Sequence, residues 1–239
     1  MTEPSQALSF GSAAAAYDRI RPSYPPEAVR WALGDARRVV DLGAGTGILT
    51  RVLIGLGYEA VPVEPDEKMR AQLVAGTPGA GPLTGSAEAI PLPDGSVDGV
   101  TAGQAYHWFD PERAHAEVAR VLRPGGVFAP IWNTRDESEP WVAAFSRILH
   151  PEGEDDETPD FGPRFGPVER ATFRHEVRHT PDTLLALVRS RSYYLTGTPQ
   201  RQRELDDRVR ELTTTHPLLA GQADFALPYV TEVYRAFRS

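Results

Sequence analysis

A run of alternate glycines, Asp41-Leu42-Gly43-Ala44-Gly45-Thr46-Gly47, constrains the fold more than any other feature of this sequence. It follows a short apolar segment at 38–42 and precedes a helix-like segment at 48–53. Glycine has no Cβ, so the backbone can turn tightly here and approach a ligand closely. The following helix presents free backbone N–H groups at its N-terminus. The pattern therefore predicts a strand, a ligand-binding loop and a helix in succession.

The spacing of the glycines excludes two common phosphate-binding loops. A dinucleotide-binding G-x-G-x-x-G loop would place its third glycine at position 48, where this chain has Ile48. A P-loop would continue with Gly-Lys-Ser/Thr, which is absent from the sequence here. Glu64 ends the next predicted strand, and its carboxylate offers two acceptor oxygens to the two hydroxyls of a ribose. These features favour a nucleoside cofactor that is not NAD.

Strand-like and helix-like segments alternate along the chain, which indicates βαβ units and a mainly parallel α/β sheet. We predict strands at 38–42, 60–64, 96–102, 126–132, 172–179 and 225–237. We predict helices at 48–53, 66–75, 111–122, 139–149, 181–192 and 200–214.

Composition narrows the choice of partners. A formal net charge of −8 and a pI of about 5.3 argue against a nucleic-acid substrate, which a basic face usually binds. The chain has no cysteine, so disulfides, cysteine nucleophiles and thiolate metal sites are excluded. No secretory signal or membrane-length apolar run is visible. We expect a cytoplasmic protein with a small-molecule partner, no nucleic acid and no membrane, and the sequence does not give its oligomeric state.

From about Phe10 to Trp132 the chain resembles the class I S-adenosylmethionine-dependent methyltransferases. Residues 39–47 match the first motif of that family, and residues 61–66 match its ribose-binding strand end. Residues 85–93 look like its adenine-side loop, and residues 121–126 look like the turn before its fifth strand. The resemblance implies S-adenosylmethionine as cofactor and S-adenosylhomocysteine as product. It also implies a Rossmann-like, seven-stranded, mostly parallel sheet with helices on both faces and a helical cap.

The same resemblance supplies the expected cofactor contacts. In the family the adenine ring lies near the backbone at positions equivalent to Ser86 and Ala87, and Met69 would pack against it. The full set of expected cofactor-binding residues is Tyr17, Arg21, Asp41, Gly43, Ala44, Gly45, Gly47, Glu64, Pro65, Met69, Ser86, Ala87, Glu88 and Gln104.

The segment Gln104–Phe109 resembles the branch that includes trans-aconitate methyltransferase. It lacks the Asn/Asp-Pro-Pro-aromatic signature of nucleobase and amide N-methylating members, and Gln104 is not an acidic metal ligand. We therefore expect O- or N-methylation of a small molecule without a metal. His107 is the expected general base, because imidazole titrates near pH ~6.5. Tyr106 is the second catalytic candidate, and it could line the methyl-transfer site with Trp108; packing of the loop is the alternative for all three residues.

The chain is expected to be a single methyltransferase domain over residues 1–239. It divides into an N-terminal cap at about 10–35, a cofactor core at about 36–135 and an acceptor-side elaboration at about 139–219. In the cap, Arg21 would bind a carboxylate, because a guanidinium matches its geometry. In the elaboration, the candidate acceptor contacts are Arg189, Arg191, Tyr193 and Tyr194, with a solvated helix face as the alternative.

Two further segments carry specific expectations. Residues 151–167 are acidic and rich in proline and glycine, which predicts a mobile lid whose Phe161 and Phe165 dock on the site when it closes. His175-Glu176-Val177-Arg178-His179 spells the H-E-x-x-H pattern of zinc proteases. Apolar and charged residues alternate there and Pro181 follows, so we predict a strand and no metal site. Three alternative functions remain: a zinc hydrolase, S-adenosylmethionine-dependent non-methyl chemistry such as cyclisation on the same fold, and a non-catalytic binding protein.

Overall fold

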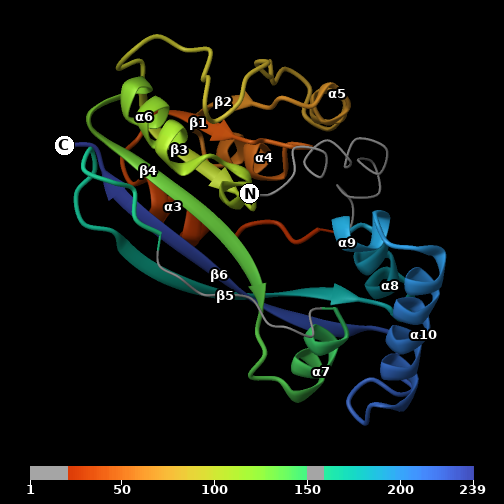
Figure 1. The fold of residues 1–239 in the computed structure, drawn as a ribbon. Coiled ribbons are helices and arrows are strands. Elements are labelled where there is room, and N and C mark those ends of the chain that lie inside the picture. The colour runs from red at the N-terminus through yellow and green to blue at the C-terminus, as the bar shows by residue number, and fades with distance from the viewer. Residues whose placement is uncertain (1–20, 150–158) are drawn as a thin grey trace.

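The computed structural model describes residues 21–149 and 159–239, which form one mixed sheet flanked by helices (Figure 1). Within these residues the strand order is β2-β1-β3-β4-β6-β5. The strands are β1 (Arg38–Leu42), β2 (Glu59–Val63), β3 (Val97–Gly103), β4 (Leu122–Arg135), β5 (Glu169–His179) and β6 (Phe225–Phe237).

The sheet is mixed, with three parallel and two antiparallel pairings, so the prediction of a mostly parallel sheet holds only in part. Strands β2, β1, β3 and β4 run parallel to one another, whereas β6 is antiparallel to both β4 and β5. The chain leaves β5 through the helices at the far end of the molecule and returns as β6 (Figure 1). This connection joins the two strands as a wide hairpin, so they must run in opposite directions.

The predicted seventh strand is also wrong, because the described residues form six strands. The segment that would lie beside β2 contributes one isolated parallel bridge between Val63 and Leu83. Its sequence, Gly76-Thr-Pro-Gly-Ala-Gly-Pro-Leu-Thr-Gly85, is rich in glycine and proline. Proline cannot donate to a strand ladder and glycine weakens one, so pairing does not extend beyond the bridge.

Helices begin where capping residues and prolines predict them. Asp110 caps α6 by accepting a hydrogen bond from the Arg113 N–H at 3.2 Å, and Thr180 forms a capping box on α8. Both helices carry proline in the first turn. The helices are α3 (Pro26–Leu33), α4 (Ile48–Gly55), α5 (Glu67–Gly76), η2 (Tyr106–Trp108), α6 (Pro111–Val121), α7 (Pro140–Leu149), α8 (Pro181–Arg189), α9 (Ser192–Leu195) and α10 (Pro199–Thr215).

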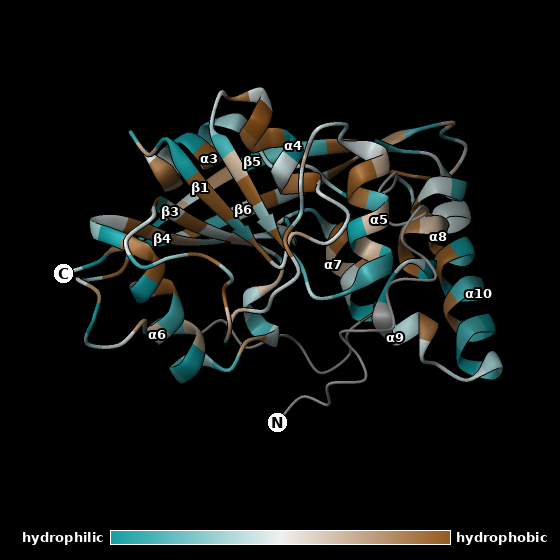
Figure 2. Ribbon diagram, turned by 90° about the horizontal axis from the view of Figure 1, so that it is seen from above, coloured by the Kyte–Doolittle hydropathy of each residue, from teal (hydrophilic) through white to brown (hydrophobic). Residues whose placement is uncertain are grey.

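Helices cover both faces of the sheet, as predicted. Helices α3 and α4 pack on one face through residues such as Val29 and Leu53, and α6 packs on the other through Val118. A separate core joins α7, α8 and α10 to the far ends of β5 and β6 around Tyr229. Figure 2 shows brown, hydrophobic residues along the central strands and a largely teal, hydrophilic α10. Among the described residues, no helix is long and apolar enough to span a membrane.

The segment expected to form a lid is anchored in its described part. Phe161 and Phe165 are 1% and 7% exposed, and both pack in the core beneath α6. The Phe161 ring lies 4.7 Å from that of Phe128, and Phe165 pairs through its backbone with Arg238. Phe161 and Phe165 are therefore part of the core, which corrects the prediction that they would dock on the site as a lid closes. Residues 151–158 of the expected lid lie outside the described residues.

Candidate functional site

The glycine loop joins the carboxyl end of β1 to α4, as predicted. Gly43, Gly45 and Gly47 have φ angles of 70°, 56° and 85°, in the left-handed region that favours glycine. The N–H groups of Gly43 and Ala44 donate to the carbonyl of Val63 at 2.9 and 3.1 Å, which fixes the loop against β2. The loop therefore lies at the carboxyl edge of the sheet, where open α/β sheets bind ligands.

The space around the three glycines differs. A Cβ on Gly43 would lie 2.7 Å from the Cβ of Ala105, and one on Gly47 would lie 2.8 Å from Cγ of Leu73. Those two positions require glycine for packing. A Cβ on Gly45 would meet none of the described residues within 4 Å. Gly45 therefore leaves open space beside its backbone, which is what a closely bound ligand needs.

Glu64 stands at the end of β2 and is 7% exposed. Its Oε2 accepts the Gly45 N–H at 2.9 Å and its Oε1 accepts the Asp66 N–H at 2.9 Å. Burial raises the pKa of this carboxyl, while the two backbone N–H groups lower it in part. Each carboxylate oxygen retains a second acceptor position, so Glu64 can hold the loop and accept ligand hydroxyls together.

Asp41 lies under the loop at the end of β1 and is 1% exposed. Its Oδ2 accepts the Thr50 hydroxyl at 2.5 Å, whereas its Oδ1 is buried and has no hydrogen-bond partner among the described residues. Burial raises the pKa of Asp41 to about 7, with a smaller contribution from the nearby charge of Glu64. An unsatisfied buried acceptor at this position fits a ligand that brings a donor or a positive charge.

The expected adenine-side residues gather beside the same edge. Met69 is buried in the first turn of α5, where Asp66 caps the helix by accepting the Met69 N–H at 2.9 Å. Ser86 pairs with Ala89 in a tight turn that buries Ala87, and Glu88 accepts the Asp110 N–H at 3.0 Å. Pro65 lies exposed between Glu64 and α5.

Gln104 follows β3 directly and has a φ of 55°, the one positive φ outside glycine among the described residues. Its N–H donates to the carbonyl of Ile131 at 2.9 Å, and its side-chain amide donates to the carbonyl of Asn133 at 2.7 Å. A non-glycine residue in this region costs on the order of 1 kcal/mol or more, and such strain clusters at functional sites. Through these two hydrogen bonds Gln104 joins the carboxyl end of β3 to β4.

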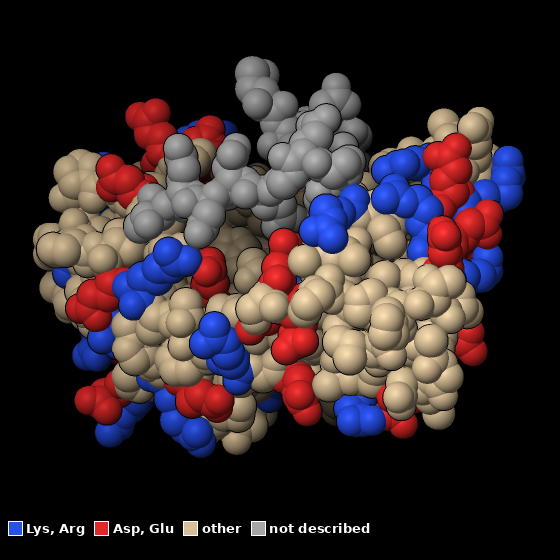
Figure 3. Space-filling view, turned by 90° about the horizontal axis from the view of Figure 1, so that it is seen from below, with Lys and Arg blue, Asp and Glu red and all other residues tan. Residues whose placement is uncertain are grey.

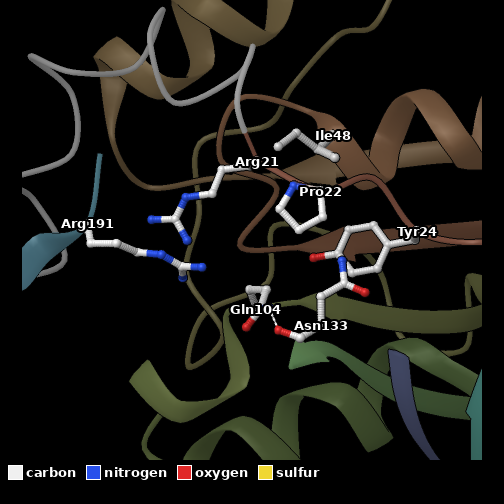
Figure 4. Close-up of a pocket in the computed structure, with 7 residues that line it drawn as sticks. All are labelled: Arg21, Pro22, Tyr24, Ile48, Gln104, Asn133 and Arg191. Carbon is white, nitrogen blue, oxygen red and sulfur yellow. Dashed lines mark hydrogen bonds between the residues drawn. The ribbon is translucent and has the colours of Figure 1, made fainter. Parts of the chain in front are cut away.

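Gln104 and Asn133 line a small, open pocket, which we call the arginine pocket. Figure 4 shows the guanidinium groups of Arg21 and Arg191 extending into it from opposite segments of the chain. Its lining is Arg21, Pro22, Tyr24, Ile48, Gln104, Asn133 and Arg191. Arg21 precedes α3 and Ile48 begins α4, so the pocket adjoins the helical end of the glycine loop. Tyr17 lies outside the described residues.

The structure separates the catalytic candidates. The ring of Tyr106 packs in the core beneath α6, and its hydroxyl is hydrogen-bonded to Nε2 of His115 at 2.9 Å. Burial raises the pKa of Tyr106 to about 12 and lowers that of His115. His107 is exposed on η2, with its ring centroid 4.8 Å from that of Trp108. Tyr106 is thus placed as a structural residue, whereas His107 is accessible.

The acceptor-side candidates also diverge. Arg189 is paired with Asp206 on α10, which its Nε approaches to 3.2 Å. Tyr193 and Tyr194 pack against the core of α7, α8 and α10. Arg191 alone among these four lines the arginine pocket. Sequence reasoning did not single out Asn133, which lines the pocket, although a polar residue near the carboxyl end of a buried strand such as β4 is the signal that marks such positions.

His175 and His179 lie on the antiparallel strand β5, which confirms the predicted strand. Side chains four residues apart on a strand are separated by about 13 Å, too far to share one metal ion. Glu176 is exposed on the opposite face. Among the described residues no group of histidine and acidic side chains is arranged to hold a metal. The zinc hydrolase alternative is therefore not favoured.

Together, the sheet and the edge define a Rossmann-like enzyme class that binds a nucleoside cofactor through a glycine loop and an acidic strand end. A sequence model of the methyltransferase domain matches residues 40–129. An uncharacterised methyltransferase of Mycobacterium tuberculosis is 49% identical over 231 residues, which cover 96% of this chain and 95% of that protein. An uncharacterised methyltransferase-like protein of Schizosaccharomyces pombe is 30% identical over 250 residues, covering 98% and 97%.

A solved structure of a candidate type II methyltransferase from Anaeromyxobacter dehalogenans is also similar. It superposes with a TM-score of 0.69 at 28% identity, covering 91% of this chain and 97% of that one. The chain belongs to the methyltransferase family and is an S-adenosylmethionine-dependent enzyme. The open space at Gly45, the acidic Glu64 and the unsatisfied oxygen of Asp41 fit that cofactor.

Proposed function

We propose that this enzyme transfers the methyl group of S-adenosylmethionine to an oxygen or nitrogen nucleophile of a small molecule. The observation that carries the proposal is the position of the arginine pocket, which adjoins the glycine loop at the same edge of the sheet. One domain, with caps at its N-terminus and beyond β4, would enclose both ligands.

The surface supports a small acceptor over a nucleic acid. On the face in Figure 3 acidic and basic side chains are interspersed, and the described residues there present no continuous basic surface. The net charge of −8 agrees with this distribution. Nucleic-acid binding draws most of its affinity from clustered Lys and Arg, so this face is poorly suited to it.

We assign the cofactor's ribose to Glu64, its adenine to the surface formed by Met69, Ser86 and Ala87, and its methionine carboxylate to Arg21 beside Gln104. Once bound, the cofactor supplies an electrophilic methyl group that an in-line nucleophile takes while the C–S electron pair stays on sulfur. The chain contributes proximity, orientation and exclusion of water. A hydroxyl or ammonium acceptor must also lose a proton, for which we assign His107 as acceptor on the exposed helix η2.

A screen of small acceptors for release of S-adenosylhomocysteine tests the proposal. With an active acceptor, His107→Ala should lower kcat by about 100-fold or more. Its affinity for S-adenosylhomocysteine should stay unchanged, because His107 does not contact the cofactor in our assignment. Release of other products from the cofactor, without a methylated acceptor, would favour cyclisation or related chemistry instead.

A further inference from the structure

The arginine pocket brings together two cations from segments far apart in the sequence. Arg21 precedes α3 and Arg191 lies between α8 and α9. Figure 4 shows their guanidinium groups converging on the space above Gln104. Neither aspartate nor glutamate occurs among the described residues that line the pocket. With no acidic side chain in this lining, the positive charge of Arg191 favours an anion in the pocket.

Arg191 has no ion pair among the described residues. Its neighbours in the fold are neutralised: Arg189 pairs with Asp206, and Arg210 pairs with Asp207 at 3.3 Å. Arg203 and Arg208 have no ion pair either, but they are exposed on the solvent side of α10. Arg191 is half-buried and faces the pocket, so the fold holds a charge there that nothing in the described chain compensates.

The backbone beside Arg191 is held next to Arg21. Nη2 of Arg21 donates to the carbonyl of Ser190 at 3.3 Å, which joins the N-terminal segment to the end of α8. Ser190 itself is 3% exposed, and its hydroxyl donates to the carbonyl of Leu187 at 2.7 Å. These contacts of Ser190 fix the backbone next to Arg191.

We propose that the acceptor carries an anionic group, a carboxylate or a phosphate, and that Arg191 binds it. The inference rests on the proposed function and names the class of acceptor. The two guanidinium groups then match two anions: the cofactor's carboxylate on Arg21 and the acceptor's anionic group on Arg191. The anion is a recognition handle, and the methylated oxygen or nitrogen lies elsewhere in the acceptor.

The test uses the full chain saturated with S-adenosylhomocysteine, titrated by calorimetry with malonate, with inorganic phosphate and with the neutral malonamide. We expect malonate or phosphate to bind and malonamide not to bind. Arg191→Gln should weaken anion binding by about tenfold or more, and Arg191→Lys should retain part of it. Arg203→Gln, which removes the same charge from exposed α10, should leave it unchanged. The stronger of the two anions identifies the handle as carboxylate or phosphate.

The affinity of the same variants for S-adenosylhomocysteine decides where Arg191 belongs. We expect Arg191→Gln to bind the product as the wild type does, and Arg21→Gln to bind it about tenfold more weakly. Parallel loss of product and anion binding in Arg191→Gln would overturn the inference and assign Arg191 to the cofactor. Equal anion binding by Arg191→Gln and wild type, or none by wild type, would also overturn it. If anions bind through Arg191 but no acceptor is ever methylated, the proposed function fails and the anion site stands.

Discussion

The N–H of Gly45 donates a hydrogen bond to Oε2 of Glu64 at 2.9 Å, so the acidic end of β2 holds the glycine loop from across the edge of the sheet. The same carboxylate accepts the Asp66 N–H through its other oxygen. One side chain thus connects the loop, the strand end and the start of α5. The pair explains how a buried carboxylate is kept in place before any ligand arrives.

Glu64→Ala should weaken binding of S-adenosylhomocysteine by about 1.5–3 kcal/mol, the usual scale for hydrogen bonds to a charged group. The substitution removes the proposed ribose acceptor and releases the Gly45 N–H. Calorimetry measures the change, with Glu67→Ala, an exposed acidic residue in the first turn of α5, as control. Normal product binding by Glu64→Ala would show that the ribose partner lies elsewhere.

Gly45→Val should abolish cofactor binding while the protein stays folded. The new side chain would fill open space beside the loop, and its left-handed φ of 56° costs roughly 1–2 kcal/mol of stability. Gly57→Val supplies a matched control, since Gly57 has a φ of 90°, similar open space and a position on the α4–β2 turn. Loss of binding in both variants, or in neither, would contradict the assignment of the loop.

Asp41 gives the protein a defined pH dependence. Its pKa rises from an ordinary value of 3.8 to about 7 in the fold. Between those values the folded protein holds a proton that the unfolded chain has lost, so the free energy of unfolding should fall as pH rises from about 4 to about 7. Urea unfolding of wild type and Asp41→Asn across this range checks the effect. The variant should lose most of the slope, and an unchanged slope would exclude Asp41 as its source.

Phe161→Ala should destabilise the protein by about 3–5 kcal/mol, as expected for a buried aromatic ring that is replaced by a cavity. Phe161 is 1% exposed against Phe128, whereas Phe237 is 43% exposed and provides the control. Urea denaturation of Phe161→Ala and Phe237→Ala measures the difference. Equally small losses of unfolding free energy in the two variants would instead support a lid that is not packed in the core.

The sequence predicted the positions of the main strands and the glycine loop well, because both depend on local patterns. Alternate glycines, a strand that ends in Glu64 and the alternation around His175 each carry their own signal. The bounds of β6, 225–237, were predicted from alternation alone and are confirmed. The number of strands was predicted wrongly, because the segment around Leu83 forms only an isolated bridge and no seventh strand.

Features that depend on distant contacts could not be predicted from the sequence. The acidic, proline-rich composition of residues 151–167 predicted a lid, whereas Phe161 and Phe165 pack in the core beneath α6. Arg189 and Arg191 look equivalent in sequence. Only the fold shows that Arg189 forms an ion pair with Asp206 and that Arg191 lines the pocket. The partner of the Tyr106 hydroxyl, His115, likewise follows from packing.

The most direct test of methyl transfer uses S-adenosylmethionine with a deuterated methyl group and a panel of small carboxylates and phosphates that also carry a hydroxyl or amine. Mass spectrometry follows the acceptor and S-adenosylhomocysteine in the same reaction. Methyl transfer predicts an acceptor heavier by one labelled methyl group, with all three deuterium atoms retained, and one product nucleoside for each methylated molecule. Consumption of the cofactor without label in any acceptor, or with loss of deuterium from the transferred group, would contradict direct displacement.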